Sequence, residues 1–385
     1  MKMRTLCVRL LWGLLLWGLI QVGGAYAQEA EPAEPAKLTE PAATEGADVA
    51  GDYREAEPTE PAATEGAGVA RDYREAAERG EAAAQYQLGL CYRDGRGVRK
   101  NPENAFRWFQ LAADQNYPEA VYRVAASYAK GEGVQRDIKK ALELAHKASE
   151  LGVAQANHAI GWSYLSGDGV GQNPREAFVW FQKAAEQGYA EAQFILATCY
   201  ATATGTKRDM NKAIEWLRKA VAQNHAASQF ALGTCYARGD GVDEDTVEAI
   251  AWFRKAADQG YAKAQCRLGK CYETGEGVKP SMAEAFQWYQ KAAELGYAEA
   301  QCHLGDCYYY GQGVEQNTIE AAKWYEKSAV QGYDEAKNML GFSYFMGRKV
   351  EEGSAKAYQW FQKKAVETAP KVQQFLKGPE EKEQK

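Results

Sequence analysis

Histidine is scarce in this chain of 385 residues, and its placement argues against a metal site. The chain has four histidines, at His146, His158, His225 and His303. Their positions share no spacing typical of metal ligands. The chain also lacks a Gly-x-Ser-x-Gly motif, which would indicate a hydrolase nucleophile. Cys302 precedes His303, but neighbours in a helix point about 100° apart and do not form a nucleophile and base pair. We therefore predict no metal, no cofactor and no catalytic residue, and we expect the protein not to be an enzyme.

A surplus of positive charge is also missing. The chain has 46 Lys and Arg against 52 Asp and Glu, a formal net charge of −6. Residues 1–27 contribute only positive charge, and residues 28–70 contribute eleven acidic residues against Lys37 and Arg54, so residues 71–385 are left without net charge. Because binding to nucleic acid requires phosphates to be neutralised, we do not expect nucleic acid as a partner.

Long apolar runs are absent except near the N-terminus. There Lys2, Arg4 and Arg9 precede an apolar run over residues 10–20, and Ala25-Tyr26-Ala27 follows it. A membrane-spanning helix needs about 20 apolar residues, which is more than this run contains. Basic residues, a short apolar run and a small-residue site are together typical of a secretory signal peptide. We predict that residues 1–27 are a signal peptide, that the mature chain has no transmembrane segment, and that the protein is periplasmic or secreted.

Residues 28–70 are poor in the large apolar side chains that a folded core requires. The segment is rich in Glu, Ala and Pro, and residues 39–56 recur almost unchanged as residues 59–76, a duplication with an offset of 20 residues. We predict that residues 28–70 are an acidic, disordered linker.

A period of 36 residues organises the rest of the chain. Valine recurs at this spacing or at twice it, with Thr206 in the one gap, at Val98, Val134, Val170, Val242, Val278, Val314 and Val350. Such self-similarity indicates a tandem array whose repeats stack on one another. The period divides the chain into eight units, which are 81–116, 117–152, 153–188, 189–224, 225–260, 261–296, 297–332 and 333–368.

Each unit contains the pattern of two helices. In the first helix Ala84, Leu88 and Tyr92 are four residues apart, which predicts a buried stripe, and Gly89 beside them is always Gly or Ala in the other units. The glycines of Gly95-Arg96-Gly97-Val98 then end the helix. The second helix begins after N-cap residues such as Asn101 and ends at Gly or Asn in all units but the last. Its predicted buried stripe includes a tryptophan, Trp108 in the first unit, in all units but one.

The cysteines follow the repeat register and not a disulfide pattern. Five of the seven that follow the signal peptide occupy one equivalent position, at Cys91, Cys199, Cys235, Cys271 and Cys307. Ser127, Ser163 and Ser343 fill that position in the other units. A position that exchanges Cys for Ser requires a small side chain, so we predict packing and not disulfide bonds.

The combined pattern of Ala-x-x-x-Leu-Gly-x-x-Tyr, Gly-x-Gly-Val and Ala-x-x-Trp-x-x-x-Ala-Ala-x-x-Gly resembles the Sel-one-like repeats, which are relatives of tetratricopeptide repeats. The resemblance covers about residues 70–368. It implies an all-α, right-handed superhelical solenoid of about eight 36-residue helix-turn-helix repeats with terminal caps. We expect a capping half-repeat at 71–80, eight repeats at 81–368 and a charged tail at 369–385. A local kink is expected near residue 204, where Ala203-Thr204-Gly205-Thr206 departs from the turn pattern.

Positions that vary among the repeats are free to bind a partner, because the shared positions serve stacking. On the first helix the variable positions lie three or four residues apart and share one face, and in related solenoids this helix lines the concave surface. Aromatic anchors beside charges at this spacing suit an extended peptide or a partner's helix. We predict partner binding on the concave face by Arg123, Lys130, Trp162, Arg267, Lys270, His303, Asp306, Tyr309 and Tyr310.

Packing is the alternative explanation for any aromatic residue on a solenoid helix. Both explanations stay open for Trp162 and Tyr309, whereas packing is favoured for Phe342 and Phe345. A lysine in the last turn of each second helix complements the helix dipole more readily than it forms a strip for anionic ligands. These lysines are Lys147, Lys183, Lys219, Lys255, Lys291, Lys327 and Lys363.

The preferred hypothesis is a non-enzymatic scaffold that binds a protein or peptide partner in the bacterial envelope or outside the cell. The resemblance implies roles in complex assembly, envelope signalling or host interaction. One alternative is a cell-wall-related hydrolase or a β-lactam- or peptidoglycan-binding protein, because cysteine-rich relatives have been linked to penicillin binding. Those relatives have regular cysteine pairs that this chain lacks. Another alternative is a glycan-binding module that uses the same aromatic residues.

Overall fold

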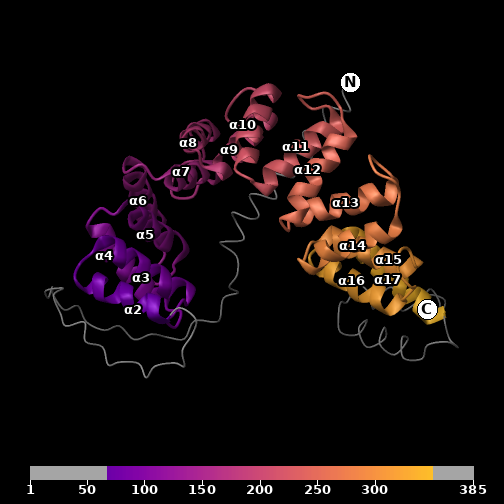
Figure 1. Cartoon of the computed structure of the whole chain (residues 1–385), viewed down its shortest axis with the longest axis horizontal. Coiled ribbons are helices and arrows are strands. Elements are labelled where there is room, and N and C mark those ends of the chain that lie inside the picture. Colours follow the sequence, from indigo (N-terminus) through magenta and orange to yellow (C-terminus); the bar gives the residue numbers. More distant parts are fainter. Residues whose placement is uncertain (1–66, 350–385) are drawn as a thin grey trace, which may run out of the picture. The chain divides into compact units, whose positions relative to one another are not determined.

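The computed structural model describes residues 67–349 (Figure 1). The predicted signal peptide, almost all of the predicted linker, the second helix of the last repeat and the charged tail lie outside the described residues. Within residues 67–349 there are sixteen helices and no strand, which confirms the all-α prediction. The helix α2 begins at Ala67, before residue 71, where the sequence placed the start of the N-terminal half-repeat.

The chain divides into two compact units, the first ending at Asp209 and the second beginning at Met210. Within each unit every helix packs on the next one along the chain, as stacked repeats require. Unit 1 contains α2 (Ala67–Glu78), α3 (Ala82–Asp94), α4 (Pro102–Asp114), α5 (Pro118–Lys130), α6 (Ile138–Glu150), α7 (Ala154–Ser166), α8 (Pro174–Glu186) and α9 (Ala190–Thr202). Unit 2 contains α10 (Met210–Ala222), α11 (Ala226–Arg238), α12 (Thr246–Asp258), α13 (Ala262–Thr274), α14 (Met282–Glu294), α15 (Ala298–Tyr310), α16 (Thr318–Val330) and α17 (Asp334–Lys349).

Local sequence signals start and end the helices where the repeat register predicts. The side chain of Asn101 accepts a hydrogen bond of 2.9 Å from the backbone N–H of Asn104, which satisfies a free donor at the start of α4. First helices end at a residue with left-handed backbone, such as Gly95 with φ 73°. Ala203 takes the same conformation with φ 65° at the end of α9, and the boundary between the two units follows this departing turn.

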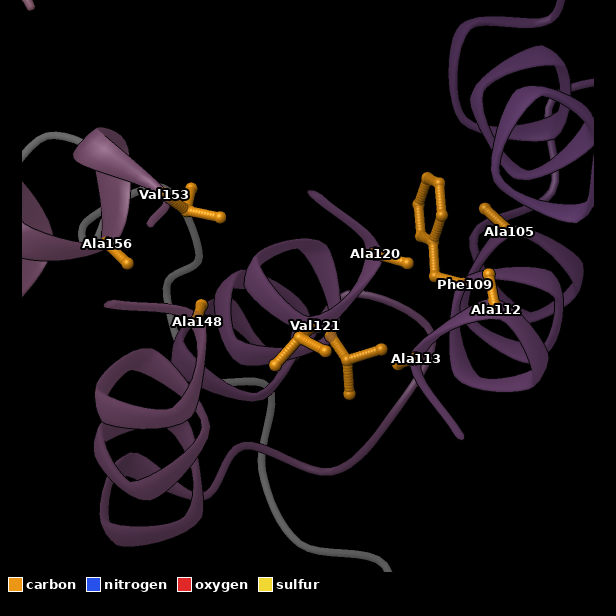
Figure 2. Packing of buried hydrophobic residues seen from close by; sticks show 10 residues of the cluster. Ala105, Phe109, Ala112, Ala113, Ala120, Val121, Ala148, Val153 and Ala156 are labelled. Carbon is orange, nitrogen blue, oxygen red and sulfur yellow. The ribbon is translucent and has the colours of Figure 1, made fainter. Parts of the chain in front are cut away.

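The core differs from the prediction in one respect. Within residues 67–349 the tryptophans of the second helices, such as Trp108, are half-buried, and the residue that follows each of them carries the core packing. Phe109 is 2% exposed and lies among small residues of α4 and α5 (Figure 2). A methyl group added to Gly89 would lie 2.6 Å from the Phe109 ring, so the glycine is required by close approach of the ring. The same contact recurs as Gly161 with Phe181, Gly233 with Phe253, Gly269 with Tyr289 and Gly305 with Tyr325.

Buried glutamines join consecutive repeats, a feature that the sequence analysis did not identify. Gln85 Nε2 donates 3.2 Å to the carbonyl of Ala77, at the end of the preceding helix. Its Oε1 accepts a 2.8 Å bond from Gln115 Nε2, at the end of the second helix of its own repeat. Both halves of the buried amide are therefore satisfied. The bond between glutamines recurs as Gln259 to Gln229 and Gln331 to Gln301.

All seven cysteines of the described chain are buried and free, in agreement with their predicted packing role. Burial raises the pKa of Cys199 and Cys235 to about 12, which keeps them as thiols at neutral pH. No helix within residues 67–349 is long and apolar enough to span a bilayer.

Candidate functional site: an acidic pocket on the first helices of unit 2

Three of the nine predicted partner-binding residues lie in unit 1. Trp162 Nε1 donates a 3.0 Å hydrogen bond to His158 Nε2, and its ring meets Phe181 edge to face at 5.7 Å. Arg123 is half-buried, and its Nε has no hydrogen-bond partner. Lys130 is exposed at the end of α5, with Nζ 3.7 Å from the carboxylate of Glu132. Trp162 therefore packs within its own repeat, and the three residues do not form one cluster.

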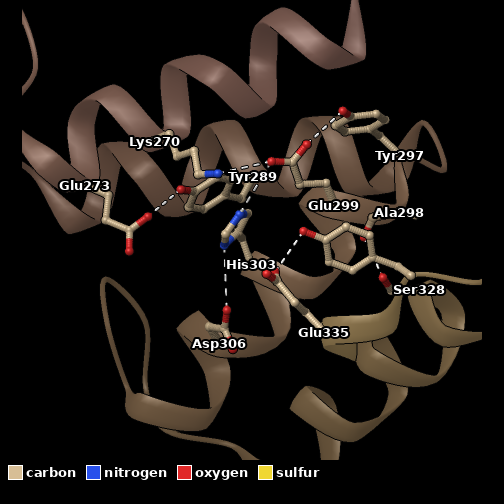
Figure 3. Close-up of polar contacts among 11 residues, drawn as sticks. Lys270, Glu273, Tyr289, Tyr297, Ala298, Glu299, His303, Asp306, Ser328 and Glu335 are labelled. Carbon is tan, nitrogen blue, oxygen red and sulfur yellow. Dashed lines mark hydrogen bonds and ion pairs between the residues drawn. The ribbon is translucent and has the colours of Figure 1, made fainter. Parts of the chain in front are cut away.

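The other six lie in unit 2, where Lys270 and His303 belong to one polar cluster (Figure 3). The Lys270 ammonium lies 3.1 Å from Oε1 of Glu299 on the next first helix. The His303 ring stacks on the Tyr289 ring with centroids 4.9 Å apart. His303 Nδ1 lies 3.6 Å from Asp306 Oδ2, and its Nε2 lies 4.0 Å from Glu299 Oε1. The histidine therefore lies between two carboxylates.

Two of the predicted residues in unit 2 make their contacts outside this polar cluster. Arg267 Nη2 lies 2.6 Å from Oε1 of Glu276, in the turn after its own helix. Tyr309 is half-buried and meets the ring of Tyr310 edge to face at 4.9 Å. Tyr310, by contrast, is 57% exposed. Of this pair, only the Tyr310 ring is exposed enough to contact a partner.

An open pocket of about 560 Å³ lies on the first helices α13, α15 and α17. Two predicted residues, Asp306 and Tyr310, belong to its lining. We name it the acidic pocket, and its lining residues are Glu273, Cys302, Asp306, Tyr310, Gln312, Glu335, Asn338 and Met339.

Each of the three carboxylates of the acidic pocket is held by a tyrosine hydroxyl. Tyr289 donates to Glu273, and Tyr325 donates to Oδ1 of Asp306 at 2.7 Å. Both tyrosines come from second helices and reach through the repeat to the first-helix face. Tyr333 donates to Glu335 at 2.9 Å. The hydroxyls orient the carboxylates before any ligand arrives, so the pocket presents fixed negative charge.

Comparison with known families identifies the repeat. The Sel1 repeat family profile matches residues 64–78, 82–117, 118–153, 154–189, 190–225, 226–261, 262–297, 298–333 and 334–364. The chain belongs to the Sel1 repeat family. Sel1 repeat proteins are generally protein-interaction scaffolds, and their solenoid fold is typically non-catalytic.

Solved Sel1 repeat structures agree with this assignment. A protective antigen of uropathogenic Escherichia coli strains, which displays an SLR fold, is 33% identical with a TM-score of 0.60. The match covers 79% of this chain and 65% of the antigen, so the chain spans slightly less than two thirds of that protein. A Sel1 repeat protein from Oxalobacter formigenes is 33% identical with a TM-score of 0.57, over 70% of this chain and 78% of that one. A comparison with curated proteins found no significant match.

Burial and hydrogen bonds set the protonation states of the side chains at the site. Burial and the neighbouring carboxylates raise the pKa of Tyr289 and of Tyr325, so both stay protonated as donors. Burial opposes ionisation of Glu299, but hydrogen bonds from Tyr297 and Lys270 outweigh it and lower its pKa. Burial raises the pKa of Cys302 to about 12, which makes it a poor nucleophile at neutral pH. No group of His, Cys, Asp and Glu within the described residues is arranged to hold a metal ion.

Sequence reasoning missed Glu273 and Glu335 and the tyrosines behind them. A signal for the tyrosines was present, since the core position that follows the tryptophan is Phe109, Phe181 and Phe253 in other Sel1 repeats. It becomes Tyr289 and Tyr325 in two consecutive repeats of unit 2, whose first helices carry the carboxylates. A hydroxyl at a buried position requires a partner, so this exchange points to polar groups opposite.

The lysines in the last turns of the second helices do not form a row of unpaired charges for an anionic ligand. Five of these lysines lie over the tryptophan three residues earlier, with Nζ 3.6–4.1 Å from the ring centroid, and they are Lys183, Lys219, Lys255, Lys291 and Lys327. Such cation–π pairs cover the outer face of the half-buried indoles. These lysines therefore stabilise the Sel1 repeats by contacts within their own helices.

Proposed function

We propose that this Sel1 repeat protein is a non-enzymatic scaffold whose acidic pocket binds a basic segment of a partner protein. The observation that carries the proposal is the set of three tyrosine-held carboxylates, Glu273, Asp306 and Glu335, around one open depression. Fixed carboxylates attract a Lys or Arg side chain and lose no side-chain entropy when it binds.

The rest of the lining suits the aliphatic stem of such a side chain. Tyr310 and Met339 supply apolar surface beside the carboxylates, and Asn338 and Gln312 supply further polar groups. Long basic side chains bury their methylene groups on apolar surface while the charge meets a carboxylate. The pocket is open, which allows the chain on either side of the basic residue to lie across neighbouring first helices.

A selection of random short peptides displayed on phage tests the proposal without a known partner. The full chain is immobilised, and we expect the enriched peptides to share a Lys or Arg beside an apolar residue. Enrichment is expected to disappear with the variant Glu273→Gln, Asp306→Asn, Glu335→Gln, and synthetic versions of the peptides should bind this variant at least about tenfold more weakly. Binding should also weaken as salt is added.

The matched control removes three exposed acidic residues from second helices of the same unit, as Glu215→Gln, Asp258→Asn and Glu284→Gln. Its change in net charge equals that of the pocket variant, so any effect of total charge is the same in both. Equal loss of binding in the two variants, or enriched peptides without a shared basic residue, overturns the proposal.

We further propose that the protein is exported and acts in the periplasm or outside the cell. The support is the N-terminal pattern of Lys2, Arg4 and Arg9, a short apolar run and Ala25-Tyr26-Ala27. The similarity to a protective antigen adds support. N-terminal sequencing of the protein from separated cell fractions should give Gln28 in an exported fraction. A protein that begins at Met1 and stays with the cytosol would contradict this location.

A further inference from the structure

His303 lies between two carboxylates beside the acidic pocket (Figure 3). Its Nδ1 is 3.6 Å from Oδ2 of Asp306, and its Nε2 is 4.0 Å from Oε1 of Glu299. Both distances are too long for a hydrogen bond, and Nε2 is buried without any hydrogen-bond partner. The ring is therefore close to both carboxylates and is bonded to neither.

The two oxygens of Asp306 face different groups. Oδ1 accepts the 2.7 Å hydrogen bond from the Tyr325 hydroxyl, whereas Oδ2 is the oxygen that lies toward His303. A cationic ligand in the acidic pocket depends on the lone pairs that Tyr325 leaves available. A new donor on His303 therefore competes with such a ligand for Asp306.

Protonation of His303 supplies this donor. An imidazolium carries an N–H group on each nitrogen, so one donor faces Asp306 and the other faces Glu299. Imidazole is the side chain that ordinarily gains its charge between about pH 8 and pH 5, a range in which ordinary carboxylates stay ionised. A mildly acidic medium thus changes the charge of the histidine and not that of the pocket carboxylates.

The helix α14 and part of α13 favour a positive charge on the His303 ring. The ring stacks on Tyr289 of α14 with centroids 4.9 Å apart, and an aromatic face attracts a cation. The Tyr289 hydroxyl donates to Glu273 of α13, another carboxylate of the acidic pocket. A charge on His303 therefore lies behind two of the three pocket carboxylates.

Two lysines of α13 act in the opposite direction, but both act on Glu299. The Lys270 ammonium lies 3.1 Å from Glu299 Oε1, and Lys263 also interacts electrostatically with this carboxylate. On the other side of α15, α16 brings the neutral Tyr325 hydroxyl to Asp306, and α17 brings Glu335 to the same pocket. Because the lysines neutralise Glu299, Asp306 is the carboxylate with which the imidazolium pairs.

We propose that His303 makes the acidic pocket sensitive to acid, because uptake of a proton pairs its ring with Asp306 and releases a bound basic segment. This inference rests on the proposed function of the acidic pocket. The proton and the basic segment oppose each other, so the affinity for the segment falls as the pH falls. The pocket holds its partner near neutral pH and releases it in mildly acidic surroundings.

The first test measures the binding of one defined probe to the full chain at two pH values and constant ionic strength. The probe is the peptide amide Ala-Leu-Arg-Leu-Ala with tetramethylrhodamine at its N-terminus, and its arginine stays charged throughout. We expect fluorescence anisotropy to give a Kd about fivefold higher near pH 5.5 than near pH 7.5. Equal Kd values overturn the role of His303 and leave the proposed function standing, whereas absence of binding near pH 7.5 overturns both.

Two substitutions assign the effect to one histidine. His303→Gln removes the titrating ring, so the ratio of its two Kd values should fall to about one. The matched control is His225→Gln, which changes the other histidine of unit 2, whose Nδ1 lies 2.8 Å from the Ser228 hydroxyl at the start of α11. The control should keep the ratio of the unsubstituted chain, and circular dichroism checks folding at both pH values. A ratio that persists in His303→Gln, or is lost in His225→Gln, overturns the assignment.

Calorimetry of the unsubstituted chain tests the same inference without a variant. Since the bound peptide disfavours the protonated ring, binding of the probe near pH 6 should release protons into the buffer. The measured binding enthalpy should therefore differ between phosphate and bis-Tris, two buffers with different ionisation enthalpies. A binding enthalpy that is the same in both buffers near pH 6 overturns the proposal.

Discussion

The hydroxyl of Tyr325 reaches from a second helix to the first-helix face and donates a 2.7 Å hydrogen bond to Oδ1 of Asp306. Its ring packs against Gly305, where a methyl group would lie 2.6 Å from the ring carbon Cε1. One residue therefore serves two purposes, since its ring fills the core and its hydroxyl orients a carboxylate of the acidic pocket. Tyr289 does the same for Gly269 and Glu273.

A double-mutant cycle on Tyr325 and Asp306 should show strong coupling. Hydrogen bonds to a charged group contribute about 1.5 kcal/mol or more, so Tyr325→Phe and Asp306→Ala should be non-additive by about that amount. Urea denaturation followed by circular dichroism measures the free energies of unfolding. Tyr325→Phe leaves the ring in place, as in the repeats that have Phe253 or Phe181, so the fold is retained. Additivity within about 0.4 kcal/mol would show that the bond does not hold the carboxylate.

Unit 1 should lose stability on mild acidification because of His158. Burial lowers its pKa to about 4, against about 6.5 in an unfolded chain, and the Trp162 indole donates to its Nε2. Below pH 6.5 the unfolded chain takes up a proton that the folded chain does not, so stability falls between about pH 6.5 and about pH 4. The loss should reach about 2 kcal/mol near pH 5.

The variant His158→Gln isolates this contribution. Urea titrations of both proteins near neutral pH and near pH 5 should show that the variant lacks about 2 kcal/mol of the pH-dependent loss. Equal losses in the two proteins would mean that other groups cause the acid sensitivity.

Leu295→Gln should stabilise unit 2. Leu295 is 58% exposed and stands where other repeats have Gln115, Gln259 and Gln331, so Gln265 Oε1 is buried without a hydrogen-bond partner. A new amide there would donate to Gln265 and raise the free energy of unfolding by about 1 kcal/mol.

The matched control for this change is Leu151→Gln in unit 1. Leu151 occupies the equivalent position, but Val121 stands where the acceptor glutamine would be, and it is fully buried. We expect no gain from this control. Equal effects of the two substitutions would show that removal of exposed leucine, and not the hydrogen bond, changes stability.

Ala203→Gly should stabilise the end of α9. Ala203 has φ 65°, a left-handed conformation that costs a residue with a Cβ atom about 1 kcal/mol relative to glycine. The gain should appear in the unfolding free energy of unit 1. The reverse change Gly239→Ala, at φ 66° with no atom closer than 3.5 Å to the added methyl group, should cost a similar amount. A loss of stability for Ala203→Gly would contradict this view of the turn.

Local signals made the helices predictable. N-cap residues such as Asn101, the glycines of the turns and the 36-residue period act within a few residues of one another, and the helices begin and end as expected. The identity of the core residue was less accessible, since Trp108 and Phe109 are adjacent and both are large. Which of them is buried depends on how far a helix rotates against its neighbour, and tertiary packing sets that rotation.

The sequence by itself determined the number and length of the repeats, the all-α fold and the packing role of the cysteines, because these follow from periodicity and from short-range chemistry. It also placed Asp306 and Tyr310 on one face. Only the tertiary structure decided that Glu273, Asp306 and Glu335 line one pocket with a tyrosine behind each. That pocket depends on distances between helices, which residues far apart in the chain set together.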